Sequence, residues 1–246
     1  AWIEVRPSAV EGNTRAIGRL LATETSLMAV VKADGYGHGA TTVARAALKG
    51  GARELGVATL KEGIELRKAG LEAPILLLGN LYDSDELEAC LKWNLTVTLS
   101  SIKEAILCEN LASGKGRNFQ VQLKLDTGMA RLGCDVEDTK DFVERIEQFR
   151  YVQLKGIYSH LALADAYPLG KAEKVTELQK SQFDSVIQTL SLPKDKLCLH
   201  LANSAGTLRS RSLHYDMVRV GLALYGYSPI DLDGNSLDLR PSLAVK

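Results

Sequence analysis

The stretch LMAVVKADGYGHGATTVARAAL, residues 27–48, sets the plan of the chain. It opens with the apolar run Leu27–Val31, passes through a glycine-rich segment and closes with the amphipathic segment Ala40–Leu48. A short apolar run flanked by turn residues is typical of a buried strand, and apolar positions at three- and four-residue steps are typical of a helix. The stretch therefore predicts one strand–loop–helix unit.

The same alternation continues along the chain. Seven further apolar runs predict strands at Leu55–Ala58, Ile75–Leu78, Leu95–Leu99, Val121–Leu125, Leu154–Tyr158, Leu197–Leu201 and Met217–Val220. Amphipathic segments between them predict helices at Lys61–Ala69, Ser84–Lys92, Ile102–Leu111, Thr139–Phe149 and Glu173–Leu190, whereas Ala205–Leu213 leaves room only for a short helix. Eight strands alternating with helices predict an α/β fold with a parallel sheet, closed as a (β/α)₈ TIM-type barrel.

The two ends of the chain depart from this plan. The segment Ala1–Val5 (AWIEV) predicts a strand, and a helix should follow from about Ala9 to Ala22. The tail Leu237–Lys246 (LDLRPSLAVK) ends on the alternation of a strand. We therefore expect a barrel domain over residues 7–236. Residues 1–6 and 237–246 should be strands of a second β-domain that is mostly absent from this chain.

Composition and charge exclude several classes of protein. Of the 246 residues, 46% are hydrophobic, and 30 Lys and Arg balance 30 Asp and Glu. A neutral chain lacks the basic surplus that nucleic acid or an anionic membrane attracts. No apolar run reaches the roughly 20 residues of a membrane span. The four cysteines lack the spacing of a zinc site, so we expect no metal and reduced thiols in a cytoplasmic protein.

Lys32 stands where a barrel enzyme places its chemistry, directly after a buried strand. An amine in that position loses hydration, which favours its neutral, nucleophilic form. The glycines at 35, 37 and 39 would let the following loop approach a ligand closely. On position alone, a surface lysine before a glycine-rich turn is the favoured explanation of the pattern.

The motif VVKADGYGHG, residues 30–39, resembles the cofactor-lysine signature of the alanine racemase family of pyridoxal-phosphate-dependent enzymes. The resemblance extends from the first strand to the tail. It implies that Lys32 carries pyridoxal 5′-phosphate as a Schiff base and that Tyr36 binds the phosphate. It gives no role to His38, which we expect to be a solvated loop residue.

Two further motifs extend the resemblance. In KLDTGMARLG, residues 124–133, Arg131 matches the arginine that contacts the phenolic oxygen of the cofactor and the carboxylate side of the substrate. Lys124 matches a position that is carbamylated in some members; unmodified, it would pair with a carboxylate. In HLANSAGTL and VRVGLALYGYSP, the resemblance assigns the phosphate site to a set of loop residues, namely Asn203, Ser204, Gly221 and Leu222.

Arg219 matches the arginine that faces the pyridine nitrogen of the cofactor. Arginine is almost never deprotonated, so it can only donate a hydrogen bond and leaves that nitrogen neutral. A neutral ring is a weaker electron sink, which favours proton transfer at Cα over transamination. An ion pair with Asp216 is the alternative for Arg219.

Three more residues complete the expected site. His160 and His200 resemble histidines that form hydrogen bonds around Arg219, although each alone would pass for a core histidine. Leu78 resembles an apolar wall of the cofactor pocket and cannot be told from a core residue by sequence. The expected catalytic residues are Lys32, Arg131, His160 and Arg219.

Racemisation needs one base on each face of Cα. Lys32 would be one; in the family the other is a tyrosine in the C-terminal domain of the partner subunit of a homodimer, and no stretch here matches it. The expected function is interconversion of L- and D-alanine. Open alternatives are a racemase for serine or another small amino acid and a non-catalytic cofactor-homeostasis barrel. A decarboxylase of the same plan should have an acid at Arg219.

Overall fold

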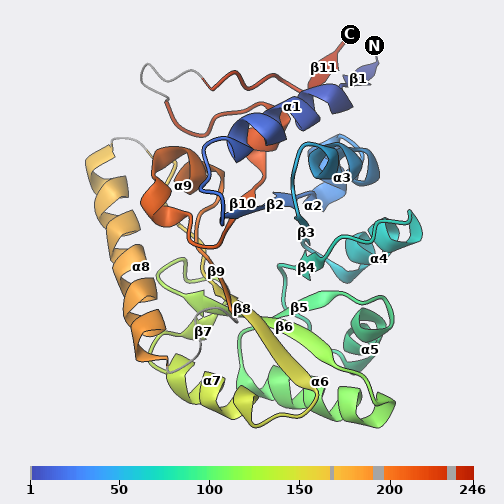
Figure 1. The fold of residues 1–246 in the computed structure, drawn as a ribbon, viewed down its shortest axis with the longest axis vertical. Helices are drawn as coiled ribbons and strands as arrows, with labels where there is room; N and C mark the ends of the chain where they lie inside the picture. Colours follow the sequence, from blue (N-terminus) through green and yellow to red (C-terminus); the bar gives the residue numbers. More distant parts are fainter. Residues whose placement is uncertain (1, 167–168, 191–196, 232–236) are drawn as a thin grey trace. The chain divides into compact units, whose positions relative to one another are not determined.

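A computed structural model of the chain describes residues 2–166, 169–190, 197–231 and 237–246. The chain forms two compact units (Figure 1). Unit 1 combines Ala1–Ile75 with Leu201–Lys246, and unit 2 is Leu76–His200.

Unit 1 is built on three parallel strands in the order β10-β2-β3. They are β2 (Ser26–Val30), β3 (Glu54–Val57) and β10 (Met217–Val220). Its helices are α1 (Pro7–Gly18), α2 (Lys32–Gly37), α3 (Ala40–Lys49), α4 (Leu60–Lys68) and α9 (Ser204–Arg209), with 3₁₀ turns η2 (Arg211–Leu213) and η3 (Leu222–Tyr225). Four consecutive residues of β2 are buried, from Leu27 to Val30. Such a continuous apolar run is typical of a parallel strand that is covered on both faces.

The two ends of the chain pair with each other in unit 1. Strands β1 (Ile3–Val5) and β11 (Leu243–Val245) form an antiparallel two-stranded sheet of their own, and Figure 1 shows them side by side at the termini. Asn13 of α1 ties the C-terminal segment to this unit. Its Nδ2 donates to the carbonyl oxygens of Leu224 (2.9 Å) and Arg240 (2.8 Å), and its Oδ1 accepts from the Arg240 N–H (2.8 Å).

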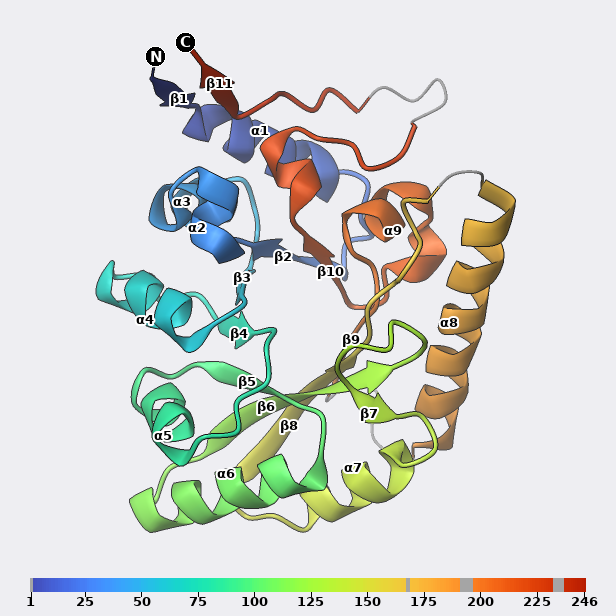
Figure 2. The same ribbon diagram turned by 180° about the vertical axis from the view of Figure 1, so that it is seen from behind.

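Unit 2 contains a parallel sheet in the order β4-β5-β6-β8-β9, with the short β7 beside β6. The strands are β4 (Ile75–Leu77), β5 (Thr96–Leu99), β6 (Phe119–Asp126), β7 (Cys134–Asp135), β8 (Val152–Tyr158) and β9 (Cys198–His200). The helices are α5 (Ser84–Lys92), α6 (Ile102–Lys115), α7 (Thr139–Glu147) and α8 (Leu169–Thr189). In Figures 1 and 2 α6 lies beside α5 on one side and α7 on the other.

The predicted parallel α/β arrangement is confirmed, as is the short helical connection before β10. The predicted helix at Ala9–Ala22 is shifted, because α1 begins at Pro7 and ends at Gly18. Proline at the first helical position has a φ suited to the helix and needs no N–H partner. The sequence analysis missed β7, which is two residues long and has no apolar run. Ala1 and residues 232–236 lie outside the described residues, so the domain boundary at residue 236 stays a prediction.

Asn13→Ala should destabilise the protein, because it leaves the polar backbone groups of Leu224 and Arg240 without their partner. We expect a loss of about 2–4 kcal/mol in the free energy of unfolding, measured by urea titration. Gly12→Ala is the matched control on the same helix. Gly12 is exposed with open space around it, so alanine there should raise stability by about 0.5–1 kcal/mol. Equal effects of the two variants would contradict the anchoring role of Asn13.

Candidate active site

The short segment labelled α2, directly after β2, is a left-handed turn and not a regular helix. Ala33, Asp34, Gly35 and Tyr36 have φ values of 52°, 52°, 62° and 53°. Each residue other than glycine in this conformation costs roughly 1–2 kcal/mol, because its Cβ crowds a backbone oxygen. Three of the four are not glycine. The turn is therefore strained, and neighbouring groups must hold it.

Hydrogen bonds close the far end of this turn. The Asp34 side chain accepts from the Ala40 N–H (2.8 Å), and the Asp34 carbonyl accepts from the Gly39 N–H (2.9 Å). His38 Nδ1 lies 3.0 Å from the Tyr36 carbonyl oxygen. Because a carbonyl only accepts, Nδ1 must carry the proton in this contact. The turn thus leads into α3 in a fixed geometry.

Tyr36 reaches from the turn to the end of β10. Its ring packs at 5.0 Å from the Tyr225 ring, and the Lys32 ammonium nitrogen lies 6.0 Å from the centre of the Tyr36 ring. The Tyr36 hydroxyl is so close to Gly221 that a Cβ there would lie 2.9 Å from it. Burial raises the pKa of the Tyr36 phenol. The hydroxyl therefore stays protonated and can donate to an anion.

Ser204 approaches the same glycine from α9. Its Oγ accepts from the N–H groups of Gly221 (3.0 Å) and Ala223 (3.4 Å), and its own proton remains available for donation. Asn203 caps α9 through its Oδ1, which accepts from the Gly206 N–H (3.0 Å), and so fixes Ser204 as the first residue of the helix. Leu222 begins η3 with an exposed side chain.

This arrangement fits a phosphate group. Two hydroxyls, from Tyr36 and Ser204, meet at Gly221, where the absence of a Cβ leaves room for their approach. At the start of η3 the N–H groups of Gly221 and Ala223 donate to Ser204 Oγ and so hold its hydroxyl in this place. The structure thus brings together Tyr36, Ser204 and Gly221, which the sequence analysis assigned to one phosphate, although they come from separate parts of the chain.

Arg219 is buried in β10, with 4% of its surface exposed. Its Nη2 donates to the Leu201 carbonyl oxygen (3.2 Å), and its backbone N–H donates to the Ala202 carbonyl oxygen (2.9 Å). In the sheet it pairs with Met28 of β2, the strand that leads to Lys32. A guanidinium held here can only donate hydrogen bonds.

The expectation for His38 was wrong. Only 8% of its surface is exposed, and its ring packs at 4.6 Å from the Tyr225 ring. The left-handed turn folds the loop back onto the buried Tyr225, which the sequence analysis missed as a site residue. The Tyr225 hydroxyl donates to the Val30 carbonyl oxygen (3.2 Å) and so joins η3 to β2. Tyr225 belongs to the motif around Gly221, but no local sequence pattern indicated its contact with Val30.

The remaining predicted residues belong to unit 2. Arg131 is exposed in a loop shaped by Asp126, whose Oδ1 accepts from the N–H groups of Gly128 (2.9 Å) and Ala130 (3.0 Å). Lys124 is buried in β6, and Leu78 is half-buried just after β4. Their roles at a cofactor stay predictions.

The two histidines of unit 2 lie in hydrogen-bonded surroundings. The ring of His200 stacks on Tyr158 at 4.8 Å, and its Nε2 lies 2.7 Å from Gln122 Oε1, which accepts its proton. The carbonyl oxygen of His160 accepts from Gln179 Nε2 (2.9 Å). The predicted hydrogen bonds of His160 and His200 to Arg219 stay predictions.

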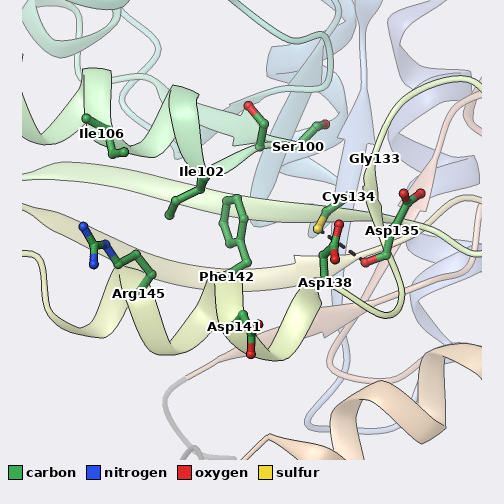
Figure 3. A pocket seen from close by; sticks show the side chains of 11 residues that line it. Ser100, Ile102, Ile106, Gly133, Cys134, Asp135, Asp138, Asp141, Phe142 and Arg145 are labelled. Carbon is green, nitrogen blue, oxygen red and sulfur yellow. Dashed lines mark hydrogen bonds between the residues drawn. The ribbon is translucent and has the colours of Figure 1, made fainter.

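Unit 2 also contains a cavity of about 630 Å³ between α6 and α7 (Figure 3). Phe142 lies between Arg145 at one end of this cavity and Asp135 and Asp138 at the other. None of the predicted site residues lines it. Cys134, on its wall, has its thiol pKa raised to about 11 by burial, so the thiol stays protonated near neutral pH.

A thiolate nucleophile, a metal site and a membrane-spanning helix find less support than the phosphate site within the described residues. All four cysteines are free, and burial raises the thiol pKa of both Cys90 and Cys108 to about 12, which disfavours a thiolate nucleophile. Within the ranges that the structure describes, no three His, Cys, Asp or Glu side chains gather as ligands for a metal ion. None of the described helices has the length and apolar character needed to cross a membrane.

Comparison with known proteins identifies the family. The family model described as "Alanine racemase, N-terminal domain" matches residues 5–229. The chain belongs to the alanine racemase family. It is 53% identical to the alanine racemase of Prochlorococcus marinus and 43% identical to that of Nostoc sp., in each case over 100% of this chain and 64% of the relative. The chain thus spans just under two thirds of the length of these relatives.

Solved structures of the family establish the fold. The alanine racemase from D-cycloserine-producing Streptomyces lavendulae superimposes with a TM-score of 0.87 and 34% identity, over 98% of this chain and 63% of that one. The fold is therefore the (β/α)₈ TIM-type barrel of the family, as predicted. The residues matched by the family model, 5–229, include both the turn after Lys32 and the segment around Gly221.

Tyr225→Phe should change how stability depends on pH. Burial raises the pKa of the Tyr225 phenol, with the neighbouring Tyr36 and Asp34 as smaller causes. Above about pH 10 the unfolded phenol ionises while the folded one keeps its proton, so stability falls as pH rises. The variant should lose this dependence, by up to about 1.4 kcal/mol per pH unit. Urea unfolding of both proteins from pH 8 to 11 tests this, and parallel curves would refute it.

Proposed function

We propose that this chain binds pyridoxal 5′-phosphate on Lys32 and takes part in the interconversion of L- and D-alanine. The observation that carries the proposal is the meeting of the Tyr36 and Ser204 hydroxyls at Gly221, which directly follows β10, the strand paired with the β2 strand that leads to Lys32. When bound, the cofactor withdraws electrons from the amino acid and acidifies its Cα proton. The relatives named as alanine racemases support alanine as the substrate.

Each predicted site residue of unit 1 then has a role in binding the cofactor or in moving a proton. Lys32 holds the cofactor and moves the proton on one face of Cα. Tyr36 and Ser204 donate to the phosphate, together with the backbone N–H group of Leu222. Gly221, whose own N–H donates to Ser204 Oγ, leaves room for the two hydroxyls, and the Asn203 cap fixes the start of α9. Arg219 donates to the ring nitrogen and keeps it neutral, which limits side reactions.

The rest of the site is proposed from the family resemblance. In unit 2 we assign Arg131 to the phenolic oxygen of the cofactor, Leu78 to an apolar wall of the pocket and His160 to the surroundings of Arg219. The second base would be a tyrosine from the C-terminal domain of the partner subunit in a homodimer. A cytoplasmic location agrees with the four free thiols. A serine racemase would share the phosphate site, so substrate comparison is part of the test.

The test begins with cofactor attachment to Lys32. Pyridoxal 5′-phosphate added to the protein should give the visible absorption of a lysine-bound cofactor, and borohydride should fix it on the peptide that contains Lys32. Lys32→Ala should abolish both signals. It should also slow the interconversion of D- and L-alanine by at least about 10²–10⁴-fold, the typical loss for one acid/base group. Faster turnover of serine than of alanine, or fixation on another lysine, would overturn the proposal.

Gly221→Ala tests the phosphate site. The new Cβ would lie 2.9 Å from the Tyr36 hydroxyl, and the packing of the Tyr36 ring on Tyr225 resists a swing of the side chain. We expect affinity for pyridoxal 5′-phosphate to fall by about 10-fold or more, since a lost hydrogen bond to a charged group costs about 1.5–3 kcal/mol. Affinity for pyridoxal, which lacks the phosphate, should change little. Equal losses for both ligands would argue against a phosphate at Gly221.

A further inference from the structure

Glu62 connects the helix after β3 to the strained turn after β2. It stands at the third position of α4, and its carboxylate accepts three backbone N–H groups. Oε2 accepts from Ala58 (2.7 Å) and Thr59 (3.1 Å), and Oε1 accepts from Ala33 (2.7 Å). The bond from Thr59 belongs to the capping box of α4, which the Thr59 side chain completes by accepting from the Glu62 N–H, and the bond from Ala58 extends it by one residue. The third bond has no part in the cap.

Unit 2 contains the same arrangement of a capping glutamate at the start of a helix, but without a strained turn beside it. Glu104 stands at the third position of α6 and accepts from the N–H groups of Ser100 (2.6 Å) and Ser101 (3.1 Å) through Oε2. Its Oε1 accepts from the Asn80 side chain (3.0 Å), where Glu62 instead binds a backbone N–H group. The cap is therefore common to both helices, while the bond to a left-handed backbone distinguishes Glu62.

The bond from Ala33 acts at the start of the turn, an end that the Gly35 N–H also spans by donating to the Val31 carbonyl oxygen (2.9 Å). Ala33 is the first left-handed residue and directly follows Lys32, whereas the bonds of Asp34 and His38 close the other end. A bond to a carboxylate is stronger than one between neutral groups. If it is lost, Ala33 can return to the more stable right-handed region. That change would redirect the Lys32 side chain and shift Tyr36, three residues further along.

We propose that Glu62 is a positioning residue, which holds the turn 33–36 so that the Lys32 amine and the Tyr36 hydroxyl can bind the cofactor together. This inference rests on the proposed function. Glu62 itself need not touch the cofactor or the substrate. It acts through one backbone hydrogen bond, and its effect on the cofactor should therefore be separable from its effect on the stability of α4.

The test uses three variants of the full chain. Glu62→Gln keeps the shape of the side chain, but its single amide oxygen can serve either Ala33 or the cap. Thr59→Ala is the matched control, because it weakens the cap and leaves all three bonds of the carboxylate. Glu104→Gln makes the same chemical change in the equivalent device of unit 2. Glu62→Asp, which keeps the charge on a shorter side chain, replaces Glu62→Gln if the latter does not fold.

Two measurements separate positioning from stability. The first is backbone hydrogen exchange of residues 33–37 without cofactor, and the second is affinity for pyridoxal 5′-phosphate, read as visible absorbance and as borohydride fixation on Lys32. Glu62→Gln should exchange about 10-fold faster in the turn and bind about 10-fold more weakly. Thr59→Ala and Glu104→Gln should lower the urea midpoint and change both readouts less than about 2-fold.

The outcomes distinguish this inference from the proposed function. If the unchanged protein is not fixed on Lys32, the proposed function fails. If it is fixed, and Glu62→Gln binds the cofactor as tightly with an unchanged exchange rate in the turn, the positioning role of Glu62 fails. Losses of affinity in Thr59→Ala or Glu104→Gln equal to that of Glu62→Gln would also overturn it, because general destabilisation would then explain the effect.

Discussion

The parallel pairing of β2 with β10 is the constraint on which the candidate site depends. Its register sets Arg219 beside Met28 and Val220 beside Ala29, so the two strands end at the same edge. Lys32 follows one strand and Gly221 follows the other. Because β2 is buried on both faces, a one-residue shift of this register would turn its side chains toward the opposite faces and disrupt the packing on each of them. The geometry of the site is thus tied to the packing of the core.

The turn between Lys32 and α3 stores strain next to this edge. Residues in sparsely populated backbone regions persist only when their surroundings hold them, and they are common at functional sites. Here the hold comes from aromatic packing on Tyr225 and from hydrogen bonds at both ends of the turn. The left-handed conformation of the turn fixes the direction of the Tyr36 side chain and so places its hydroxyl against Gly221. Local instability is therefore balanced by contacts from distant segments.

Capping residues do more than begin helices in this chain. Glu62 and Glu104 each satisfy the backbone N–H groups at the start of a helix and also bind a residue that follows another strand. Such a carboxylate links neighbouring loops, where barrel enzymes place their chemistry. The stability of the helix and the geometry of the loop then depend on the same side chain, which makes their separation by matched variants informative.

The sequence by itself determined the strands, most of the helices and the position of Lys32 at a strand end, because apolar runs and helical periodicity are local properties. The resemblance of its motifs added the phosphate residues. Only the tertiary structure decided that Tyr36 lies against Gly221, that His38 is buried and that Glu62 binds Ala33. These contacts join residues far apart in the chain through the packing of β2, β3 and β10, and no local pattern encodes them. The two-residue β7 was missed for the same reason, since pairing with β6 alone defines it.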